Sequence, residues 1–410
     1  MKHCHTLIIG AGILGLTLAK RLIEKGHKDI LIIDKESDVA KHASGRNSGV
    51  LHAGIYYGAD SFKAKFCLSG NHQMQAYCRE HNLALKNTGK VIVTHNQSEL
   101  DTLFELEKRA RQNGARVDLV DEKELADIEP NAKTEKFALY SYYTAVVDPK
   151  EICAHLKQSL LNSGKVCFQF NCKFLSNTKN IVTTQQGKIE YQYLINVAGA
   201  YADIVAKQFG IGETLIMLPF KGIYRKLQPA YTHLINGNIY PVPNIKNPFL
   251  GVHFTKNIHG EVYLGPTAIP ALGRENYQKF QGVNKELLAI LGHSAQLFLT
   301  NPKFRQVALT EPKKYLATYF FNDAKKLVKQ LEPHWIQPAN KAGIRPQLVD
   351  WQTKELVMDF LFEQTENSLH VLNAISPAFT SSMALADYLI KPLTIFSAPD
   401  ESSKTIVSHL

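Results

Sequence analysis

The most constraining feature of this sequence is a glycine-rich turn close to its N-terminus. An apolar run at 7–9 leads into Gly10, Gly12 and Gly15, spaced as G-x-G-x-x-G, and residues 16–25 have helical character. In a strand–turn–helix unit the first glycine allows the tight turn, the second lets a pyrophosphate touch backbone, and the third lets the helix pack close to the sheet. The segment therefore predicts a dinucleotide-binding turn, with phosphates at a helix N-terminus.

An acidic residue stands at the distance from the turn that such a site requires. Asp34 closes a second apolar strand at 30–33, about 20 residues beyond Gly15. A carboxylate there accepts hydrogen bonds from ribose hydroxyls and repels a 2′-phosphate. The pattern suits FAD as well as NAD, so the choice between them stays open. The alternative is a glycine-rich turn in an α/β domain without a cofactor.

Composition places the chain among ordinary globular proteins. Its 410 residues are 45% hydrophobic and 20% charged, and its apolar runs fall short of the ~20 residues that cross a bilayer. The first strand starts so near Met1 that no signal peptide is expected, which predicts a cytoplasmic protein. The six cysteines show no C-x-x-C and no metal-type pairing with histidine, so we expect reduced thiols and no metal site.

The net charge of +10 favours an anionic partner. Lysine and arginine are spread along the chain instead of clustered, so a nucleic acid is not expected as a partner. An anionic small molecule fits better. Peripheral contact with the inner face of the cell membrane stays open.

Two further strand–turn–helix units follow in the sequence, and they predict the fold. One comprises the run 189–199 and a helix at 201–209; the other comprises a strand at 369–372, the loop 373–383 and a helix to 390. Between them, short strands separated by Pro, Gly and Asn at 215–270 indicate an antiparallel sheet. We predict an α/β fold, in which a discontinuous Rossmann-like domain (1–80, 145–210 and 340–395) carries an inserted antiparallel-sheet substrate domain (81–144 and 211–339).

Other elements are predicted from periodicity and turn residues. Helices are expected at 61–81, 99–113, 148–162, 285–299 and 322–331, with a short acidic helix and turn at 118–130. Strands are expected at 89–94, 138–147, 165–174, 223–227, 239–242, 250–254, 262–265, 341–349 and 356–362, and a frayed tail after 392. The small-residue stretch 43–57 is too glycine-rich for a helix, and ordered loops of that length tend to be functional.

Several stretches resemble one enzyme family. The three nucleotide-domain units split by an antiparallel sheet look like the FAD-dependent oxidoreductases of the D-amino-acid oxidase and glycerol-3-phosphate dehydrogenase group. Within that group, the chain is similar to the L-2-hydroxyglutarate dehydrogenases/oxidases. The matching stretches are 46–57, 219–222, 239–243, 248–254, 264–266, 342–345 and 369–382.

The resemblance implies that FAD oxidises an L-2-hydroxy diacid by hydride transfer from C2 to the flavin N5. His52, in the loop that looks like the family's flavin-facing loop, is our candidate base, with His253 the second choice. Arg345 resembles the arginine that holds a substrate carboxylate, a task that suits a bidentate guanidinium. The remaining expected substrate ligands are Lys221, for the second carboxylate, and the hydrogen-bond donors Tyr56 and Tyr57.

The resemblance also implies a set of FAD ligands. Residues 376–380 would offer backbone N–H groups to the pyrimidine end of the flavin, where negative charge develops on reduction. The expected cofactor residues are Gly10, Gly12, Ile13, Leu14, Gly15, Asp34, Lys35, Ser44, Arg46, Ser48, Ala198, Gly199, Ser376, Pro377, Ala378, Phe379 and Thr380.

Other functions stay open at this point. Within the superfamily, an amino-acid or amine oxidase and a glycerol-3-phosphate-type dehydrogenase are the alternatives. A third alternative, motivated by the basic charge, is a flavin-dependent tRNA-modifying or otherwise nucleic-acid-binding protein, and a flavoprotein that binds FAD without turnover is the last. The electron acceptor is expected to be oxygen or a membrane quinone.

Overall fold

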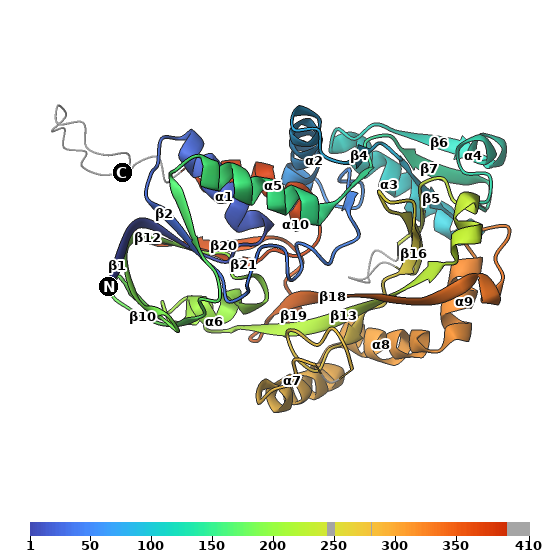
Figure 1. Cartoon of the computed structure of the whole chain (residues 1–410). Helices are drawn as coiled ribbons and strands as arrows, with labels where there is room; N and C mark the ends of the chain where they lie inside the picture. Colours follow the sequence, from blue (N-terminus) through green and yellow to red (C-terminus); the bar gives the residue numbers. More distant parts are fainter. Residues whose placement is uncertain (244–250, 280, 392–410) are drawn as a thin grey trace.

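The structure is a computed structural model that describes residues 1–243, 251–279 and 281–391. Two large sheets dominate it (Figure 1), one of eight strands and one of ten, and a three-stranded sheet joins β3 (Val50–Leu51), β8 (Ala145–Val147) and β4 (Leu85–Lys86). Among the helices of the described chain, none is both long and apolar enough to cross a membrane.

Parallel strands form the centre of the eight-stranded sheet. β1 (Lys2–Ile9) lies between β2 (Ile30–Ile33) and β12 (Gly187–Asn196), and all three run in the same direction. Every residue of β2 is buried, as expected for a parallel strand covered on both faces. The other strands are β9 (Val166–Gln169), β10 (Phe174–Thr178), β11 (Ile181–Thr184), β20 (Leu361–Gln364) and β21 (Ser368–Asn373).

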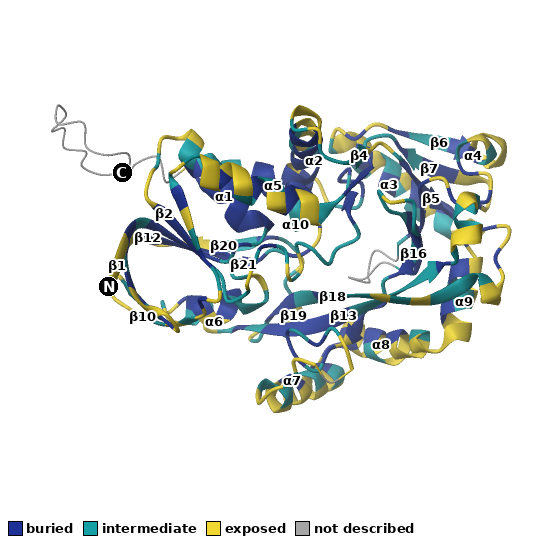
Figure 2. Ribbon diagram, in the orientation of Figure 1, coloured by how far each residue is buried: buried dark blue, intermediate teal, exposed yellow. Residues whose placement is uncertain are grey.

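Four helices cover one face of this sheet (Figures 1 and 2). Their apolar side chains form one core with strand residues such as Ile8 and Ile32, while the short helix α6 (Ala202–Lys207) packs near the other face. The four helices are α1 (Ile13–Glu24), α2 (Phe62–Glu80), α5 (Pro149–Asn162) and α10 (Ala378–Leu389).

The ten-stranded sheet is antiparallel except where β5 (Lys90–Val93) runs parallel to β14 (Asn238–Pro241). Its longest pair joins β13 (Leu215–Leu227) to β18 (Ile336–Asp350), so β18 crosses the domain boundary expected at residue 340. The remaining strands are β6 (Val117–Asp121), β7 (Phe137–Ser141), β15 (His253–Lys256), β16 (Val262–Gly265), β17 (Ile269–Pro270) and β19 (Glu355–Leu356).

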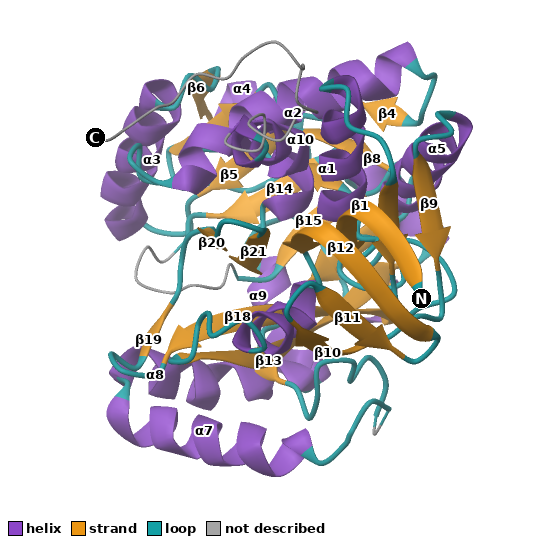
Figure 3. Cartoon of the chain, turned by 90° about the vertical axis from the view of Figure 1, so that its left-hand side faces the viewer, coloured by secondary structure: helices purple, strands orange, loops and turns teal. Residues whose placement is uncertain are grey.

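Helices also flank this second sheet. α7 (Glu286–Thr300) and α8 (Pro302–Thr310) pack on the β13–β18 pair and form an outer layer (Figure 3). The other helices are α3 (Leu100–Gln112), α4 (Glu122–Ile128) and α9 (Ala317–Lys325).

The predicted α/β fold class is confirmed, and the differences are local. The expected strand 138–147 is two strands, β7 and β8, which belong to different sheets. The acidic segment 118–130 holds β6 before α4, the expected strand 165–174 ends at Gln169, and the helix expected at 322–331 is α9, which lies earlier. Helix α8 was missed, although Asn301 caps it and Pro302 starts it. The start of the strand expected at 250–254 and the tail after 392 lie outside the described residues.

Candidate active site

A cavity of about 990 Å³ lies where the two sheets face each other. Segments that follow β1, β2, β12 and β21 line it, so the carboxyl ends of these parallel strands all open on it, which is where α/β sheets bind ligands. Residues of β13, β14, β15 and β18 form the opposite wall. We call this space the central cavity.

The glycine turn lies at one end of the central cavity, and its geometry requires glycine. Gly10 has φ +115°, and a Cβ there would lie 2.5 Å from the carbonyl oxygen of Val197. A Cβ on Gly15 would collide with the carbonyl oxygen of Gly10, so this glycine serves helix packing and does not itself line the cavity. Helix α1 has Gly12 as its N-cap, without a side-chain cap, and no acid in its first turn. Its N-terminus is therefore suited to an anion.

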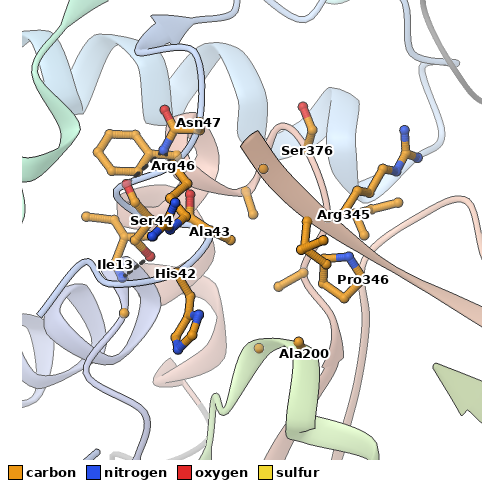
Figure 4. A pocket seen from close by; sticks show the side chains of 18 of the residues that line it. Ile13, His42, Ala43, Ser44, Arg46, Asn47, Ala200, Arg345, Pro346 and Ser376 are labelled. Atoms are coloured by element: carbon orange, nitrogen blue, oxygen red, sulfur yellow. Dashed lines mark hydrogen bonds between the residues drawn. The ribbon is translucent and has the colours of Figure 1, made fainter. Parts of the chain in front are cut away.

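Two polar side chains brace the turn. The Ser44 hydroxyl accepts a hydrogen bond from the Ile13 N–H at 2.9 Å (Figure 4). The Asp34 carboxylate accepts one from the Ala11 N–H at 2.8 Å and one from the Glu36 N–H at 2.9 Å. Carboxylate oxygens have further lone pairs, so Asp34 can still accept from a ribose hydroxyl.

The segment 274–278, which follows β17 of the ten-stranded sheet, covers this end of the cavity, and the local sequence pattern does not predict this. Lys35, one of the expected cofactor residues, lines the cavity, and its ammonium contacts Glu36, His42 and Glu275. Those three are the one group of candidate metal ligands among the described residues, and Lys35 already places a cation between them. The Arg46 guanidinium lies 4.0 Å from the ring centre of Tyr277. Expected residues Ser48, Ala198 and Gly199 also line the cavity.

The N-terminus of α10 forms the middle of the cavity wall. Residues 374–380 line it, including Ser376, and Figure 4 shows Ser376 between the 42–47 loop and Arg345. The partial positive charge at a helix N-terminus stabilises a nearby negative charge. The Thr380 hydroxyl accepts a hydrogen bond from the His52 N–H at 3.2 Å, which ties this helix to the His52 loop.

His52 is held through its backbone, and its side chain lines the cavity. Its carbonyl oxygen accepts hydrogen bonds from the Asn71 amide at 3.0 Å and from the Cys67 thiol at 3.4 Å, both on α2. Burial, with the Lys90 and His253 side chains nearby, lowers the pKa of His52 to about 3. The imidazole is therefore neutral at physiological pH, the form that a general base needs.

His253 lies on the opposite wall with a fixed ring. Its Nδ1 donates to the Gly251 carbonyl oxygen at 2.8 Å, and its ring lies 3.9 Å from that of Tyr240, centre to centre. Burial lowers its pKa to about 4. Because a backbone carbonyl can only accept, Nδ1 carries the proton and Nε2 is left as the acceptor.

Arg345 lines the far end of the cavity from β18, away from the 42–47 loop (Figure 4). Burial lowers its pKa to about 10, which still leaves it charged at neutral pH. The pKa of Tyr57 is raised well above its ordinary value, mainly by burial, and that of Tyr56 likewise. The structure thus brings His52, His253, Arg345 and both tyrosines to one cavity.

Comparison with known proteins agrees with this architecture. Residues 5–391 match the family described as FAD dependent oxidoreductase. The L-2-hydroxyglutarate dehydrogenase of Escherichia coli is 33% identical over 408 residues, covering 98% of this chain and 96% of that protein. The mitochondrial L-2-hydroxyglutarate dehydrogenase of Homo sapiens is 33% identical over 404 residues, covering 93% of this chain and 86% of that protein. The chain belongs to the L-2-hydroxyglutarate dehydrogenase family.

A solved structure supports the fold independently. L-alpha-glycerophosphate oxidase from Mycoplasma pneumoniae, solved with FAD bound, has a TM-score of 0.74 at 20% identity, over 96% of this chain and 95% of that chain. The predicted family, the FAD cofactor and the oxidoreductase class are confirmed. The glycine turn fits this cofactor, because Gly10 and Gly12 line the cavity and the N-terminus of α1 has neither a side-chain cap nor an acid in its first turn.

Lys221, expected to bind the second carboxylate of the substrate, does not line the central cavity. Its ammonium donates to the Gln278 carbonyl oxygen at 3.4 Å. The segment that covers the glycine-turn end of the cavity therefore also covers Lys221. We no longer assign it a substrate carboxylate.

Two buried lysines that the sequence did not single out lie at the substrate end. Lys63, in the first turn of α2, lines the cavity. The ammonium of Lys90, on β5, lies 4.6 Å from the ring centre of Tyr56 and 4.9 Å from that of Tyr240. Burial lowers the pKa of each lysine to about 7. Each is only one of many lysines in the sequence, and burial by distant elements is what sets them apart.

Proposed function

We propose that this protein oxidises L-2-hydroxyglutarate to 2-oxoglutarate. The observation that carries the proposal is the convergence of His52 and Arg345, nearly 300 residues apart, on a cavity that begins at the glycine turn. Its relatives at 33% identity bear the name of that activity. Bound FAD supplies the acceptor for the hydride that leaves C2.

His52 and Arg345 divide the work on the substrate. Arg345 pairs with the carboxylate next to C2, since a guanidinium binds a carboxylate through two parallel hydrogen bonds. His52 takes the hydroxyl proton. Its Nδ1 is buried from solvent and has no hydrogen-bond partner in the described chain, so Nε2 is the ring nitrogen that reaches substrate. An anionic substrate raises the pKa of the imidazole toward the range in which it holds the proton.

The cofactor is assigned to the other end of the cavity. Gly10, Gly12 and the N-terminus of α1 would hold the pyrophosphate, and Asp34 would accept from the ribose. Residues 376–380 would face the pyrimidine end of the flavin. This proposal keeps the division into a discontinuous cofactor domain and a substrate domain. The boundary expected at residue 340 is moved past the end of β18.

The electron acceptor is oxygen or a membrane quinone, and one surface favours the quinone. Leucines of the outer helices are exposed, with Leu288 at 79% and Leu299 at 72%, and lysines flank them, including Lys285 and Lys303. Exposed apolar residues beside cations suit an anionic bilayer. Sedimentation with vesicles containing anionic lipid, but not with neutral vesicles, is the expected result; equal recovery in both would remove this argument for a quinone.

Anaerobic mixing of the FAD-loaded protein with a panel of substrates tests the proposal. We expect L-2-hydroxyglutarate to bleach the flavin absorbance rapidly and to yield 2-oxoglutarate. The D-enantiomer, glycerol 3-phosphate and L-glutamate should bleach it at least about 100-fold more slowly. Rapid bleaching by an amino acid or by glycerol 3-phosphate, and not by L-2-hydroxyglutarate, would overturn the assignment.

A further inference from the structure

The substrate end of the central cavity holds a second cation close to Arg345. Lys63 lines the cavity and is only 6% exposed, although it is an ordinary solvent-facing residue type. Its ammonium lies 5.8 Å from the ring centre of Tyr57, and Tyr57 in turn interacts electrostatically with Arg345. The three side chains, from a helix, a loop and a strand, thus form one wall.

The carboxylate that acts electrostatically on Lys63, that of Asp359, already accepts two hydrogen bonds. The Asp359 carboxylate accepts hydrogen bonds from the backbone N–H groups of Phe62 and Lys63, at 2.7 and 3.0 Å, and so caps the start of α2. The Lys63 ammonium makes no hydrogen bond or ion pair with any described residue. Cys67, a further titratable group near Lys63, is a buried thiol whose pKa is raised to about 12, so it is neutral.

A buried ammonium with an arginine as its neighbour is unfavourable unless an anion joins it. The second positive charge of Arg345 adds to that cost, because like charges repel. A ligand with two carboxylates would place one of them beside the Lys63 ammonium while the other binds Arg345. A ligand with one carboxylate, held by Arg345, would leave the Lys63 ammonium without an anion.

We propose that Lys63 binds the distal carboxylate of a dicarboxylic substrate, while Arg345 holds the carboxylate next to the oxidised carbon. This rests on the proposed function and adds the reason why a diacid is preferred to a monoacid. Lys63 takes the role that the sequence had suggested for Lys221. Lys90 is unsuited to it, because the rings of Tyr56 and Tyr240 cover its ammonium and it does not line the cavity.

The test uses binding without turnover, so it is independent of the proposed reaction. Glutarate and butyrate are added to the FAD-loaded protein, and dissociation constants are read from changes in the flavin spectrum. The variant is Lys63→Met, and the matched control is Lys65→Met, on the same helix but exposed. We expect Lys63→Met to weaken glutarate by about 30-fold or more, with butyrate changed less than about threefold and Lys65→Met unchanged. Equal weakening of both ligands, or none of either, would overturn the proposal.

A pH series on the unmodified protein covers the case in which Lys63→Met does not fold. The pKa of Lys63 is lowered to about 7 by burial and by Arg345, while Asp359 opposes this and the pKa of Tyr57 is far higher. Raising the pH from 6 to 9 therefore removes the lysine charge and should weaken glutarate about 10-fold or more, with butyrate nearly constant. Parallel behaviour of the two acids would contradict the proposal. Tight glutarate binding without bleaching by L-2-hydroxyglutarate would instead count against the proposed reaction alone.

Discussion

The two ends of the central cavity differ in how their charges are paired. At the glycine-turn end, Lys35 contacts Glu36 and Glu275, and buried Arg274 pairs with Asp203 and Glu286. At the substrate end, the Lys63 and Lys90 ammonium groups make no hydrogen bond or ion pair with described residues. The cations at the glycine-turn end are therefore paired within the protein, whereas at the substrate end Lys63, which lines the cavity, is the cation that the proposed anionic ligand would pair.

The pKa directions report the same difference. The pKa values of Lys35 and Arg274 are raised, since hydrogen-bonded carboxylates outweigh the cost of burial. Those of Lys63 and Lys90 are lowered, because burial is not offset by a partner. A protein keeps such a cost where function needs it. Pairing stabilises the cofactor end, and unpaired charge prepares the substrate end.

The largest effect is expected from the base at the substrate end. His52→Asn should lower kcat by about 10²–10⁴, with FAD content unchanged, measured as the rate of anaerobic flavin reduction. His253→Asn is the control on the opposite wall and should lower the rate less. A larger loss in His253→Asn than in His52→Asn would reverse the two assignments.

Removing the charge at Arg345 should come next. Arg345→Met takes away the partner of the carboxylate, which costs about 2–5 kcal/mol and lowers kcat/KM by about 30-fold to several thousand-fold. Arg345→Lys keeps the charge but loses the bidentate geometry, so its kcat/KM should lie between that of the unmodified enzyme and that of Arg345→Met. Steady-state kinetics with L-2-hydroxyglutarate measures this, and an Arg345→Met enzyme with unchanged kcat/KM would remove Arg345 from the site.

Substitutions in the glycine turn should change stability and FAD binding through steric fit instead of through charge. Gly15→Ala forces a Cβ onto the Gly10 carbonyl and should destabilise the protein by about 1–3 kcal/mol, with loss of bound FAD. Gly292→Ala in α7 meets open space, so it should stabilise by about 0.5–1 kcal/mol. Thermal unfolding and FAD absorbance give both readouts. Equal effects of the two substitutions would show that the turn tolerates a side chain.

Lys90→Met tests the difference between the two ends of the cavity through the pH dependence of protein stability. The folded pKa of Lys90 is about 7, below the unfolded value of about 10.4. The unfolded state therefore binds more protons between those values, so the stability of the native enzyme should rise with pH across that window. Lys90→Met should make this slope shallower and should raise the free energy of unfolding by about 1–4 kcal/mol at neutral pH. Urea unfolding at pH 6, 7.5 and 9 measures it; a Lys90→Met protein less stable at pH 6 would show that Lys90 has a stabilising partner.

The strand–turn–helix–strand unit at the glycine-turn end could be predicted from the sequence because its signals are local. Gly10, Gly12 and Asp34 belong to one strand–turn–helix–strand unit and stand within about 25 residues of one another. The start of helix α5 is likewise predicted by two adjacent residues, because Asp148 caps the helix and Pro149 is its first residue.

The substrate end could be predicted only in part, because its residues gain their roles from distant contacts. His52 and Arg345 stand in stretches that resemble the family, and both line the cavity. Lys63 and Lys90 gain theirs only when Tyr57, Tyr56 and Tyr240 from other elements bury them. The local sequence pattern around Lys221 does not predict that its ammonium donates a hydrogen bond to the carbonyl oxygen of Gln278.

A crystal structure of the FAD-loaded protein with glutarate tests the central claim most directly. The account predicts one carboxylate within hydrogen-bond distance of the Arg345 guanidinium, the other within hydrogen-bond distance of the Lys63 ammonium, and His52 facing the carbon chain. Glutarate bound with neither cation, or His52 more than about 10 Å from the ligand, beyond a direct contact or one bridging water, would contradict it.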